Sequence, residues 1–337
     1  MRLHAYAPTR IDLAGGTLDI WPLYLFHPGA LTLNLAITRY AHCVLEGQRD
    51  GRIVLISRDG TRREKFPSLA ALVRRRRYRL PLLAHLVAAF APRGGLSVTT
   101  WSEAPSGSGL GGSSALGIAL CAALAQWGGA GVRIGRAEWI PLVRDVEARI
   151  LSVPTGEQDH YPALYGGVSA IHLEPRRTRR EALHVDLAAL ESRLLLAYTG
   201  KPRRSGVNNW EVFKRHLEGN RSVRGSFRAL TATAVAMRDA LVEEDWRTFG
   251  RLLAREWHHR RRNAPAISTP FIDRLVRIAR CNGAQAGKVC GAGGGGCVVF
   301  FTAAERRTQV AKALVGAGAT LLPFQIARSG VRVERLR

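Results

Sequence analysis

A ten-residue segment rich in glycine and serine, at positions 105–114, carries the clearest chemical signal in this 337-residue chain. Its sequence is PSGSGLGGSS, and it joins a strand-like segment to a long apolar segment expected to be helical. Glycines let the backbone approach a phosphate group closely, while free N–H groups and the positive end of a helix dipole favour its charge. We therefore expect a phosphate cradle made by Pro105, Gly107, Ser108, Gly109, Leu110, Gly111, Gly112, Ser113 and Ser114.

Other known loop types explain these residues less well. A dinucleotide fold with the pattern G-x-G-x-x-G needs an acidic residue about twenty positions further on, and residues 127–135 contain none. A Walker A loop needs a lysine before the first serine, whereas Gly112 precedes Ser113 here. A merely flexible loop is the remaining alternative, and it fits poorly with two serines that open a regular helix.

A second segment with chemical potential lies near the N-terminus, where residues 7–19 have the sequence APTRIDLAGGTLD. It places the basic Arg10 on a strand-like stretch nine positions before the acidic Asp19. A carboxylate in such a segment can accept hydrogen bonds from neighbouring hydroxyls of a ligand. The alternatives are a tight turn at Gly15 and Gly16 and a plain ion pair between Arg10 and Asp19.

A third segment, KVCGAGGGGC at positions 288–297, is glycine-rich and lies near the C-terminus. It also contains G-x-G-x-x-G, but the following residues favour a strand over 297–301 rather than a helix. That order argues against a dinucleotide site. A glycine hairpin is the structural alternative.

Together these segments resemble the motifs of the GHMP kinase superfamily, named after galactokinase, homoserine kinase, mevalonate kinase and phosphomevalonate kinase. PSGSGLGGSSA is similar to its phosphate-binding pattern P-x-x-x-G-L-G-S-S-A, and KVCGAGGGG is similar to K-x-x-G-A-G-x-G-G. The resemblance implies that ATP is a cofactor, with its triphosphate in the 105–114 loop. It also implies a magnesium ion held by Ser114 and Glu147. Without the resemblance, Glu147 is also explained as a solvated helix residue.

A fourth segment, GEQDHY at positions 156–161, resembles the G-x-Q-D-x-Y pattern of heptose phosphate kinases and related sugar kinases. The resemblance implies that Asp159 is the catalytic base and that Arg10 acts beside it. The open alternatives are His160 as the base and Asp159 as an ordinary helix N-cap. The implied substrate contacts are Arg10, Gly15, Gly16, Thr17, Asp19, Asp159, Tyr161, Gly293 and Gly294.

One departure from the heptose kinases leaves the sugar open. Those enzymes usually have A-G-G-G-T-D, whereas Thr17 and Leu18 replace Gly and Thr before Asp19 in this chain. A basic stretch with Lys201, Arg203 and Arg204 is expected in an exposed loop, either to receive a substrate phosphate or as ordinary solvated charge.

The elements that would position these residues follow an α+β order. The charged run at 174–180 is the best candidate for a boundary between two lobes, 1–174 and 175–337. The resemblance implies an N-terminal nucleotide-binding lobe that is ribosomal protein S5 domain 2-like and a ferredoxin-like C-terminal lobe. Strands are expected at 3–7, 31–38, 41–47, 53–57, 96–101, 167–173, 193–198, 297–301 and 321–327, and helices at 78–91, 113–127, 137–151, 210–217, 227–257, 271–280 and 303–317.

The net charge of +24 is unusual, and arginine supplies nearly all of it, because only five of the 50 basic residues are lysine. Genome composition or a hot habitat explains such a bias. The alternatives are a preference for anionic substrates and nucleic-acid binding through arginines such as 74–77 and 260–262. We expect a small-molecule sugar or sugar phosphate as partner, no nucleic acid, and a monomer or homodimer.

The remaining composition excludes several classes. No apolar run is long enough to span a membrane, and the N-terminus leaves no room for a secretory signal, so we expect a cytoplasmic protein. The five cysteines lack zinc-site spacing and are expected to be reduced, buried thiols.

The expected activity is ATP- and Mg²⁺-dependent transfer of the γ-phosphate to a hydroxyl of a sugar or sugar phosphate, such as the anomeric hydroxyl of a heptose 7-phosphate. A mevalonate-type isoprenoid kinase is the second enzymatic hypothesis. The third is a ligand-sensing protein that kept the fold without catalysis.

Overall fold

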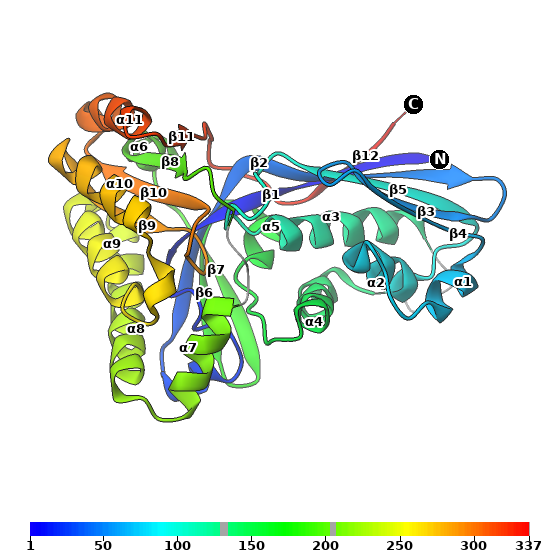
Figure 1. Cartoon of the computed structure of the whole chain (residues 1–337), viewed down its shortest axis with the longest axis horizontal. Coiled ribbons are helices and arrows are strands. Elements are labelled where there is room, and N and C mark those ends of the chain that lie inside the picture. Colours follow the sequence, from blue (N-terminus) through cyan, green and yellow to red (C-terminus); the bar gives the residue numbers. More distant parts are fainter. Residues whose placement is uncertain (129–133, 203–206, 337) are drawn as a thin grey trace.

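The chain folds around two β-sheets with α-helices packed against them (Figure 1). The computed structural model describes residues 1–128, 134–202 and 207–336, with backbone only at 207 and 208. The larger sheet has the order β12-β1-β2-β5-β3-β4, and β6 and β7 extend it from the first part of β2. Its strands are β1 (Arg2–Ala14), β2 (Leu31–Gln48), β3 (Ile53–Ser57), β4 (Arg62–Phe66), β5 (Gly95–Ser102), β6 (Val168–Glu174), β7 (Arg177–Leu183) and β12 (Arg332–Arg335).

The smaller sheet is antiparallel and has the order β11-β8-β10-β9. Its strands are β8 (Leu194–Tyr198), β9 (Ala284–Val289), β10 (Cys297–Thr302) and β11 (Thr320–Leu321). The α-helices are α1 (Leu69–Arg74), α2 (Pro81–Phe90), α3 (Gly112–Trp127), α4 (Trp139–Leu151), α5 (His160–Tyr165), α6 (Leu187–Arg193), α7 (Val207–Leu217), α8 (Arg221–Val242), α9 (Trp246–Arg260), α10 (Pro270–Cys281) and α11 (Arg307–Gly316). Short 3₁₀ helices are η1 (Leu23–Phe26), η2 (Arg136–Glu138), η3 (Pro265–Ile267) and η4 (Ala304–Arg306).

Strands β1 and β2 connect the two halves of the molecule. The first part of β2 pairs with β6 and its second part with β5, while β1 pairs with β2 along its length. Burial along β1 alternates at first and is continuous from Ala7 onward, because the second half of the strand is covered on both faces. Arg10 therefore lies at the point where both halves of the fold enclose the backbone.

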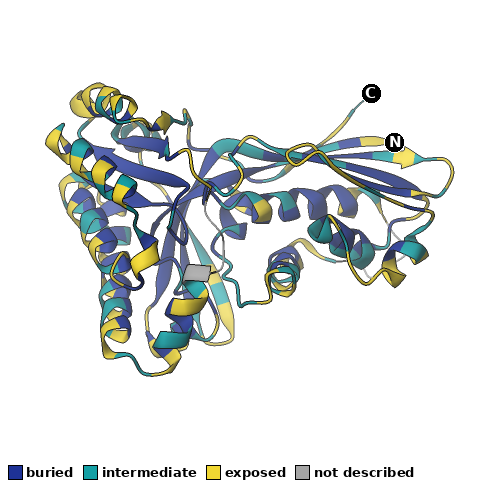
Figure 2. Cartoon of the chain, in the orientation of Figure 1, coloured by how far each residue is buried: buried dark blue, intermediate teal, exposed yellow. Residues whose placement is uncertain are grey.

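Helix α3 forms the centre of the N-terminal half and is buried along most of its length (Figure 2). It packs on β1 and β2 and is flanked by α2, α4 and α5. Small residues make this packing close: a Cβ at Gly117 would overlap Val143 of α4. The apolar sequence of α3 thus places the glycine-rich loop, which precedes it, at the junction of the two sheets.

Most predicted elements are confirmed, and the α+β class is correct. Residues 31–38 and 41–47 form one strand rather than two, and 227–257 is interrupted between α8 and α9, where Glu244 has a positive φ and Asp245 caps α9. The predicted strand at 321–327 is wrong, because pairing is confined to β11 and one bridge at Ile326. Strands β4, β7, β9 and β12 were not predicted.

Three other expectations can be compared with the structure. Four of the cysteines are buried as expected, but Cys281 at the end of α10 is exposed. The predicted lobe boundary falls in the turn between β6 and β7, both of which belong to the larger sheet, and it stays a prediction. Within the described residues, every helix is too short or too polar to cross a bilayer.

Candidate active site

A cavity of about 360 Å³ lies where the predicted motifs converge. All the residues from Ala104 to Ser114 line it, so the whole predicted cradle faces this space. The first motif contributes Arg10, Thr17 and Asp19, and the third contributes Gly291. Segments that are far apart in the sequence thus line one continuous cavity.

The glycine-rich loop has the backbone shape that a cradle requires. Gly107, Gly109 and Gly111 all have φ between 67° and 81°, a region that glycine adopts without strain. Gly111 is the N-cap of α3, so the positive end of this 16-residue helix points into the cavity. The third motif supports the loop, because Cys297 N–H donates to the carbonyl of Ser108 at 2.7 Å.

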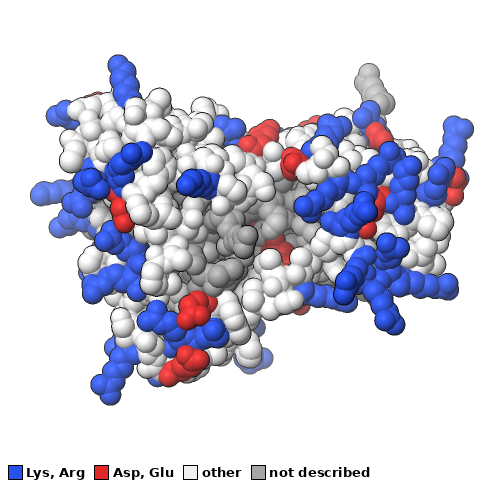
Figure 3. Space-filling view, in the orientation of Figure 1, with Lys and Arg blue, Asp and Glu red and all other residues white. Residues whose placement is uncertain are grey.

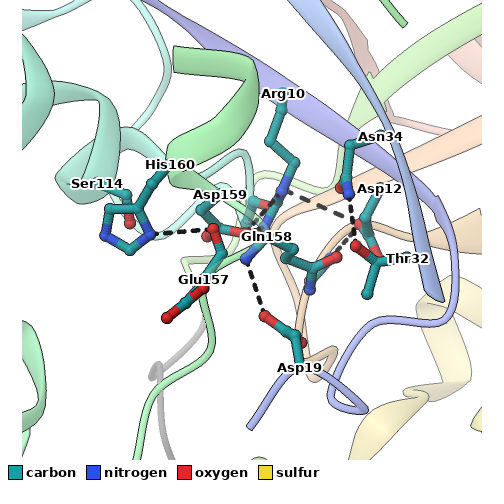
Figure 4. Close-up of polar contacts among 12 residues, drawn as sticks. Arg10, Asp12, Asp19, Thr32, Asn34, Ser114, Glu157, Gln158, Asp159 and His160 are labelled. Carbon is teal, nitrogen blue, oxygen red and sulfur yellow. Dashed lines mark hydrogen bonds and ion pairs between the residues drawn. The ribbon is translucent and has the colours of Figure 1, made fainter. Parts of the chain in front are cut away.

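Arg10 and Asp159 form an ion pair at the edge of this loop (Figure 4). The Arg10 Nε and Nη2 groups donate to Oδ1 of Asp159 at 2.9 and 2.6 Å, and Nη1 donates to the Gly109 carbonyl at 2.5 Å. Arg10 is only 1% exposed, and burial alone would lower its pKa, but the carboxylates of Asp159 and Asp12 raise the pKa above its ordinary value. Arg10 therefore stays charged and links the carboxylate of Asp159 to the glycine-rich loop through hydrogen bonds to both.

The Asp159 side chain faces the cavity and does not cap helix α5. It occupies the N-cap position of α5, but its side chain makes no capping hydrogen bond. It lines the cavity and approaches the loop so closely that a Cβ on Gly111 would lie 3.1 Å from its carboxylate. The alternative base, His160, is fully buried and does not line the cavity.

Asp19 lies in the cavity wall next to the 156–159 segment. Its Oδ2 accepts a hydrogen bond from the backbone N–H of Gln158 at 2.9 Å, and a Cβ at Gly156 would overlap its carboxylate. Burial raises the pKa of Asp19 to about 6, and the negative charges of Asp159 and Glu157 act in the same direction. A buried carboxylate with so few donors is a strong acceptor for ligand hydroxyls.

Glu147 provides a third carboxylate, on α4 beside the start of α3. It accepts hydrogen bonds from Ser113 and Ser114, the latter at 3.0 Å, and it lies 3.2 Å from Nε2 of His160. Burial alone would raise the pKa of Glu147, but the His160 contact and the serine hydroxyls lower it. The interpretation of Glu147 as a solvated residue is wrong, because it is 8% exposed.

These oxygens fit a magnesium site. Mg²⁺ prefers hard oxygen ligands and commonly takes only one or two carboxylates from the protein, with phosphates and waters completing its shell. The Glu147 carboxylate and the Ser114 hydroxyl converge at the cavity wall beside the cradle. No cluster of three or more His, Cys, Asp or Glu ligands occurs among the described residues, so a site formed by protein ligands alone is not indicated there.

Replacing Glu147 with Gln is expected to weaken Mg²⁺ binding about tenfold or more, because the charge that would face the ion is lost while the serines remain. Titration of Mg²⁺ into enzyme with a non-hydrolysable ATP analogue measures the affinity directly. Glu138→Gln, an exposed carboxylate at the start of the same helix, is the matched control. An unchanged Mg²⁺ affinity in Glu147→Gln would remove this residue from the metal site.

Several predicted substrate residues do not line the cavity. Gly15 and Gly293 have positive φ and no room for a side chain, against the backbone of Leu31 and of Ile267. Gly294 N–H donates to the same Ile267 carbonyl at 2.9 Å. Tyr161 is buried in the core, and Gly16 lies behind the wall, where its carbonyl accepts from Arg260. Direct substrate contact by these five residues stays a prediction.

Other residues reach the site without having been predicted. Gln158, Asn209 and Arg260 line the cavity, and Asn209 of α7 accepts a hydrogen bond from Thr17 at 3.3 Å. The position of Asp12 near Arg10 was weakly indicated by the sequence, because Asp12 follows Arg10 by two positions on one strand and so shares its face. Arg203 and Arg204, considered for a substrate phosphate, lie outside the described residues.

Known proteins share both the sequence pattern and the architecture. The family model described as "GHMP kinases N terminal domain" matches residues 75–167, and "GHMP kinases C terminal" matches residues 237–319. A D-glycero-alpha-D-manno-heptose 7-phosphate kinase from Campylobacter jejuni is 28% identical to this chain, over 99% of each sequence.

Two solved structures show the same fold. A D-glycero-D-manno-heptose 1-phosphate kinase from Bacteroides thetaiotaomicron superimposes with a TM-score of 0.79 at 24% identity, covering 99% of both chains. Galactokinase from Lactococcus lactis in complex with galactose gives a TM-score of 0.81 at 19% identity, covering 98% of this chain and 95% of that chain. At these identities the structures establish the common two-sheet architecture.

Proposed function

Because this chain belongs to the GHMP kinase family of ATP-dependent phosphotransferases, we propose that it phosphorylates a hydroxyl of a sugar or sugar phosphate. The leading candidate is the anomeric hydroxyl of a heptose 7-phosphate. The observation that carries this proposal is the juxtaposition of the Arg10–Asp159 pair and the buried Asp19 beside the glycine-rich loop. The proposed nucleotide-binding loop, the proposed general base Asp159 and the proposed sugar-binding residue Asp19 all line one cavity.

In the proposed reaction, the loop and the start of α3 bind the triphosphate of ATP through backbone N–H groups and the helix dipole. When bound, Mg²⁺ would neutralise charge on the phosphates, and Glu147 and Ser114 are the residues that would hold it. Asp159 accepts the proton of the attacking sugar hydroxyl, and Arg10 stabilises negative charge on the transferred group. Positioning and charge stabilisation are the main demands of phosphoryl transfer, and these residues supply both.

Asp19 supports a polyol substrate rather than an acyl acid. A carboxylate accepts hydrogen bonds from two neighbouring hydroxyls, whereas the carboxylate of mevalonate would be repelled by it. The relative from Campylobacter jejuni, aligned over 99% of the chain, is named as a heptose 7-phosphate kinase and supports the same choice. The exchange at Thr17 and Leu18 leaves the identity of the sugar to experiment.

The proposal is tested by measuring ATP consumption with a panel of acceptors: heptose 7-phosphate, mannose, galactose and mevalonate. Turnover that depends on a sugar and on Mg²⁺ is the expected result, with the highest kcat/KM for the heptose phosphate. Turnover with mevalonate alone would replace the proposal by the isoprenoid hypothesis. Absence of turnover with every acceptor, together with intact ATP binding, would favour the ligand-sensing hypothesis.

The strongly basic surface of the protein is also compatible with small anionic ligands. Lys and Arg side chains are spread over both halves of the face in Figure 3. Arg74 to Arg77, at and just after the end of α1, are exposed and contribute to the net charge of +24. Because ATP and sugar phosphates are anionic, such a surface accelerates their encounter with the protein, and this effect weakens as salt rises.

A further inference from the structure

A chain of buried charges runs behind the cavity and takes no part in the steps described above. The carboxylate of Asp12 lies 2.9 Å from the ammonium of Lys288, which also donates to the Asp12 carbonyl at 2.8 Å. The same ammonium lies 3.6 Å from Oε1 of Glu256. Glu256 pairs in turn with Arg260, one helical turn further along α9, at 2.6 Å.

Both ends of this chain reach the candidate active site. At one end, Nη1 of Arg10 lies 3.9 Å from Asp12, and Arg10 holds Asp159 (Figure 4). At the other end, Arg260 lines the cavity and donates to the carbonyl of Gly16 at 3.1 Å. The resulting series alternates in sign along its whole length: Asp159, Arg10, Asp12, Lys288, Glu256 and Arg260.

All members of the series except Asp159, whose side chain is 24% exposed, are almost completely withdrawn from solvent. The side chains of Asp12, Lys288 and Glu256 are fully buried, and Arg260 is 4% exposed. Burial alone would raise the pKa of Asp12, but Lys288 and Arg10 hold it well below its ordinary range. Buried ion pairs contribute little net stability compared with apolar packing, so their presence beside a reaction site points to a role in orientation.

We propose that Asp12, Lys288, Glu256 and Arg260 form a positioning network that orients Arg10 against Asp159 and holds the backbone after β1 at Gly16. The inference rests on the function proposed above, because it assigns a purpose to the partner of the proposed base. Arg10 uses Nε and Nη2 for Asp159, so only the Gly109 carbonyl and Asp12 fix its third nitrogen. Without Asp12, the Gly109 carbonyl alone holds this nitrogen, so the guanidinium is oriented less firmly against the base.

Two single substitutions of opposite charge test the network through kcat, the KM for ATP and the pH dependence of kcat/KM. Asp12→Asn removes a negative charge near the Arg10–Asp159 pair, so the acid limb of the profile is expected about one pH unit lower. Lys288→Met removes a positive charge while Asp12 keeps its contacts with Arg10, so the acid limb is expected to move upward. Both variants are expected to lower kcat about 10- to 100-fold through misorientation, with the KM for ATP unchanged.

The diagnostic feature is that the acid limb moves in opposite directions in the two variants. The charged groups that face Asp159 are Arg10 from β1, Asp19 from the loop after β1 and His160 from α5. None of these is altered in the two variants, and Arg10 is the group that contacts both Asp159 and Asp12. A purely structural role would change stability without moving the acid limb in opposite senses.

A double variant covers the case in which a single variant fails to fold. Asp12→Asn with Lys288→Met removes both charges and keeps the volume, which buried pairs often tolerate. Its acid limb is expected near that of the wild type, with kcat still lowered about tenfold. The control is Glu181→Gln with Arg238→Met, an ion pair between β7 and α8 that does not line the cavity, and it should leave both quantities unchanged.

The inference fails if the double variant keeps wild-type kcat, or if either folded single variant keeps both kcat and the acid limb. That outcome leaves the proposed function intact, provided that Asp159→Asn is inactive. If Asp159→Asn instead keeps its activity, the proposed function fails first, and the network loses the purpose assigned to it.

Discussion

Replacing Asp159 with Asn should lower kcat about 10³-fold while ATP still binds, because a general base of this kind contributes about 10²–10⁴-fold. Asn keeps the shape of the side chain but cannot accept the proton of the sugar hydroxyl. It also leaves the glycine-rich loop and Glu147 untouched, so the nucleotide keeps its contacts. The measurements are sugar-dependent ADP formation and the Kd for ATP.

Asp145→Asn is the matched control for this variant, because Asp145 is an exposed carboxylate on α4 that pairs with a neighbouring arginine. It should retain wild-type kcat. Wild-type turnover by Asp159→Asn would show that another group accepts the proton. A simultaneous loss of ATP binding would indicate damage to the cradle instead of loss of the base.

Replacing Asp19 with Asn should lower kcat/KM for the sugar about a hundredfold or more, since hydrogen bonds to a charged group contribute about 1.5–3 kcal/mol each. The KM for ATP should change little, because Asp19 lies on the side of the cavity formed by the first motif. Steady-state kinetics with sugar and ATP varied separately distinguish the two effects. A rise in the KM for ATP alone would place Asp19 at the nucleotide rather than at the sugar.

The same variant should make the free protein more stable at neutral pH. Burial raises the pKa of Asp19 to about 6 in the folded state, against about 3.9 in an unfolded chain. The folded state therefore holds the proton between these values, and the wild type loses up to about 3 kcal/mol as pH rises through that window. Chemical denaturation at pH 4 and pH 8 should show a larger decrease for wild type than for Asp19→Asn. Equal decreases in the free energy of unfolding would mean that ionisation of Asp19 does not destabilise the folded protein.

The sequence predicted the parts of the site that depend on short-range patterns. The glycine-rich loop was recognisable because the positive φ angles at Gly107, Gly109 and Gly111 require glycine at fixed positions next to a helix start. Asp19 and Asp159 were recognisable because each belongs to a short motif. Their distance from each other in space was not predictable from composition or spacing, and only the resemblance to a family suggested it.

The buried network was beyond the reach of sequence patterns. Lys288 and Asp12 are 276 positions apart, and nothing in either local sequence indicates the pairing. Arg260 lies in the run His258-His259-Arg260-Arg261-Arg262, in which only the phase of α9 decides which side chain is buried. The pairing of Glu256 and Arg260, four positions apart on a helix, was the one detectable link.

The errors in the fold have local causes. The segment 321–327 contains Pro323, which has no N–H to donate to a ladder, and pairing stops at Leu321. The break between α8 and α9 occurs without glycine or proline, at Glu244, so the usual signal of a helix end is missing. Strand β7 was not recognised because its run of charged residues resembles a solvated loop, although it lies at the end of the larger sheet.

The central claim is that three distant segments enclose one triphosphate and bring residue 159 to an alcohol. A crystal structure of the Asp159→Asn variant with ATP, Mg²⁺ and heptose 7-phosphate tests it most directly. We expect the triphosphate along residues 105–114 and the acceptor hydroxyl within hydrogen-bond reach of position 159. Triphosphate bound elsewhere, or a sugar whose hydroxyls all lie far from position 159, would contradict the account.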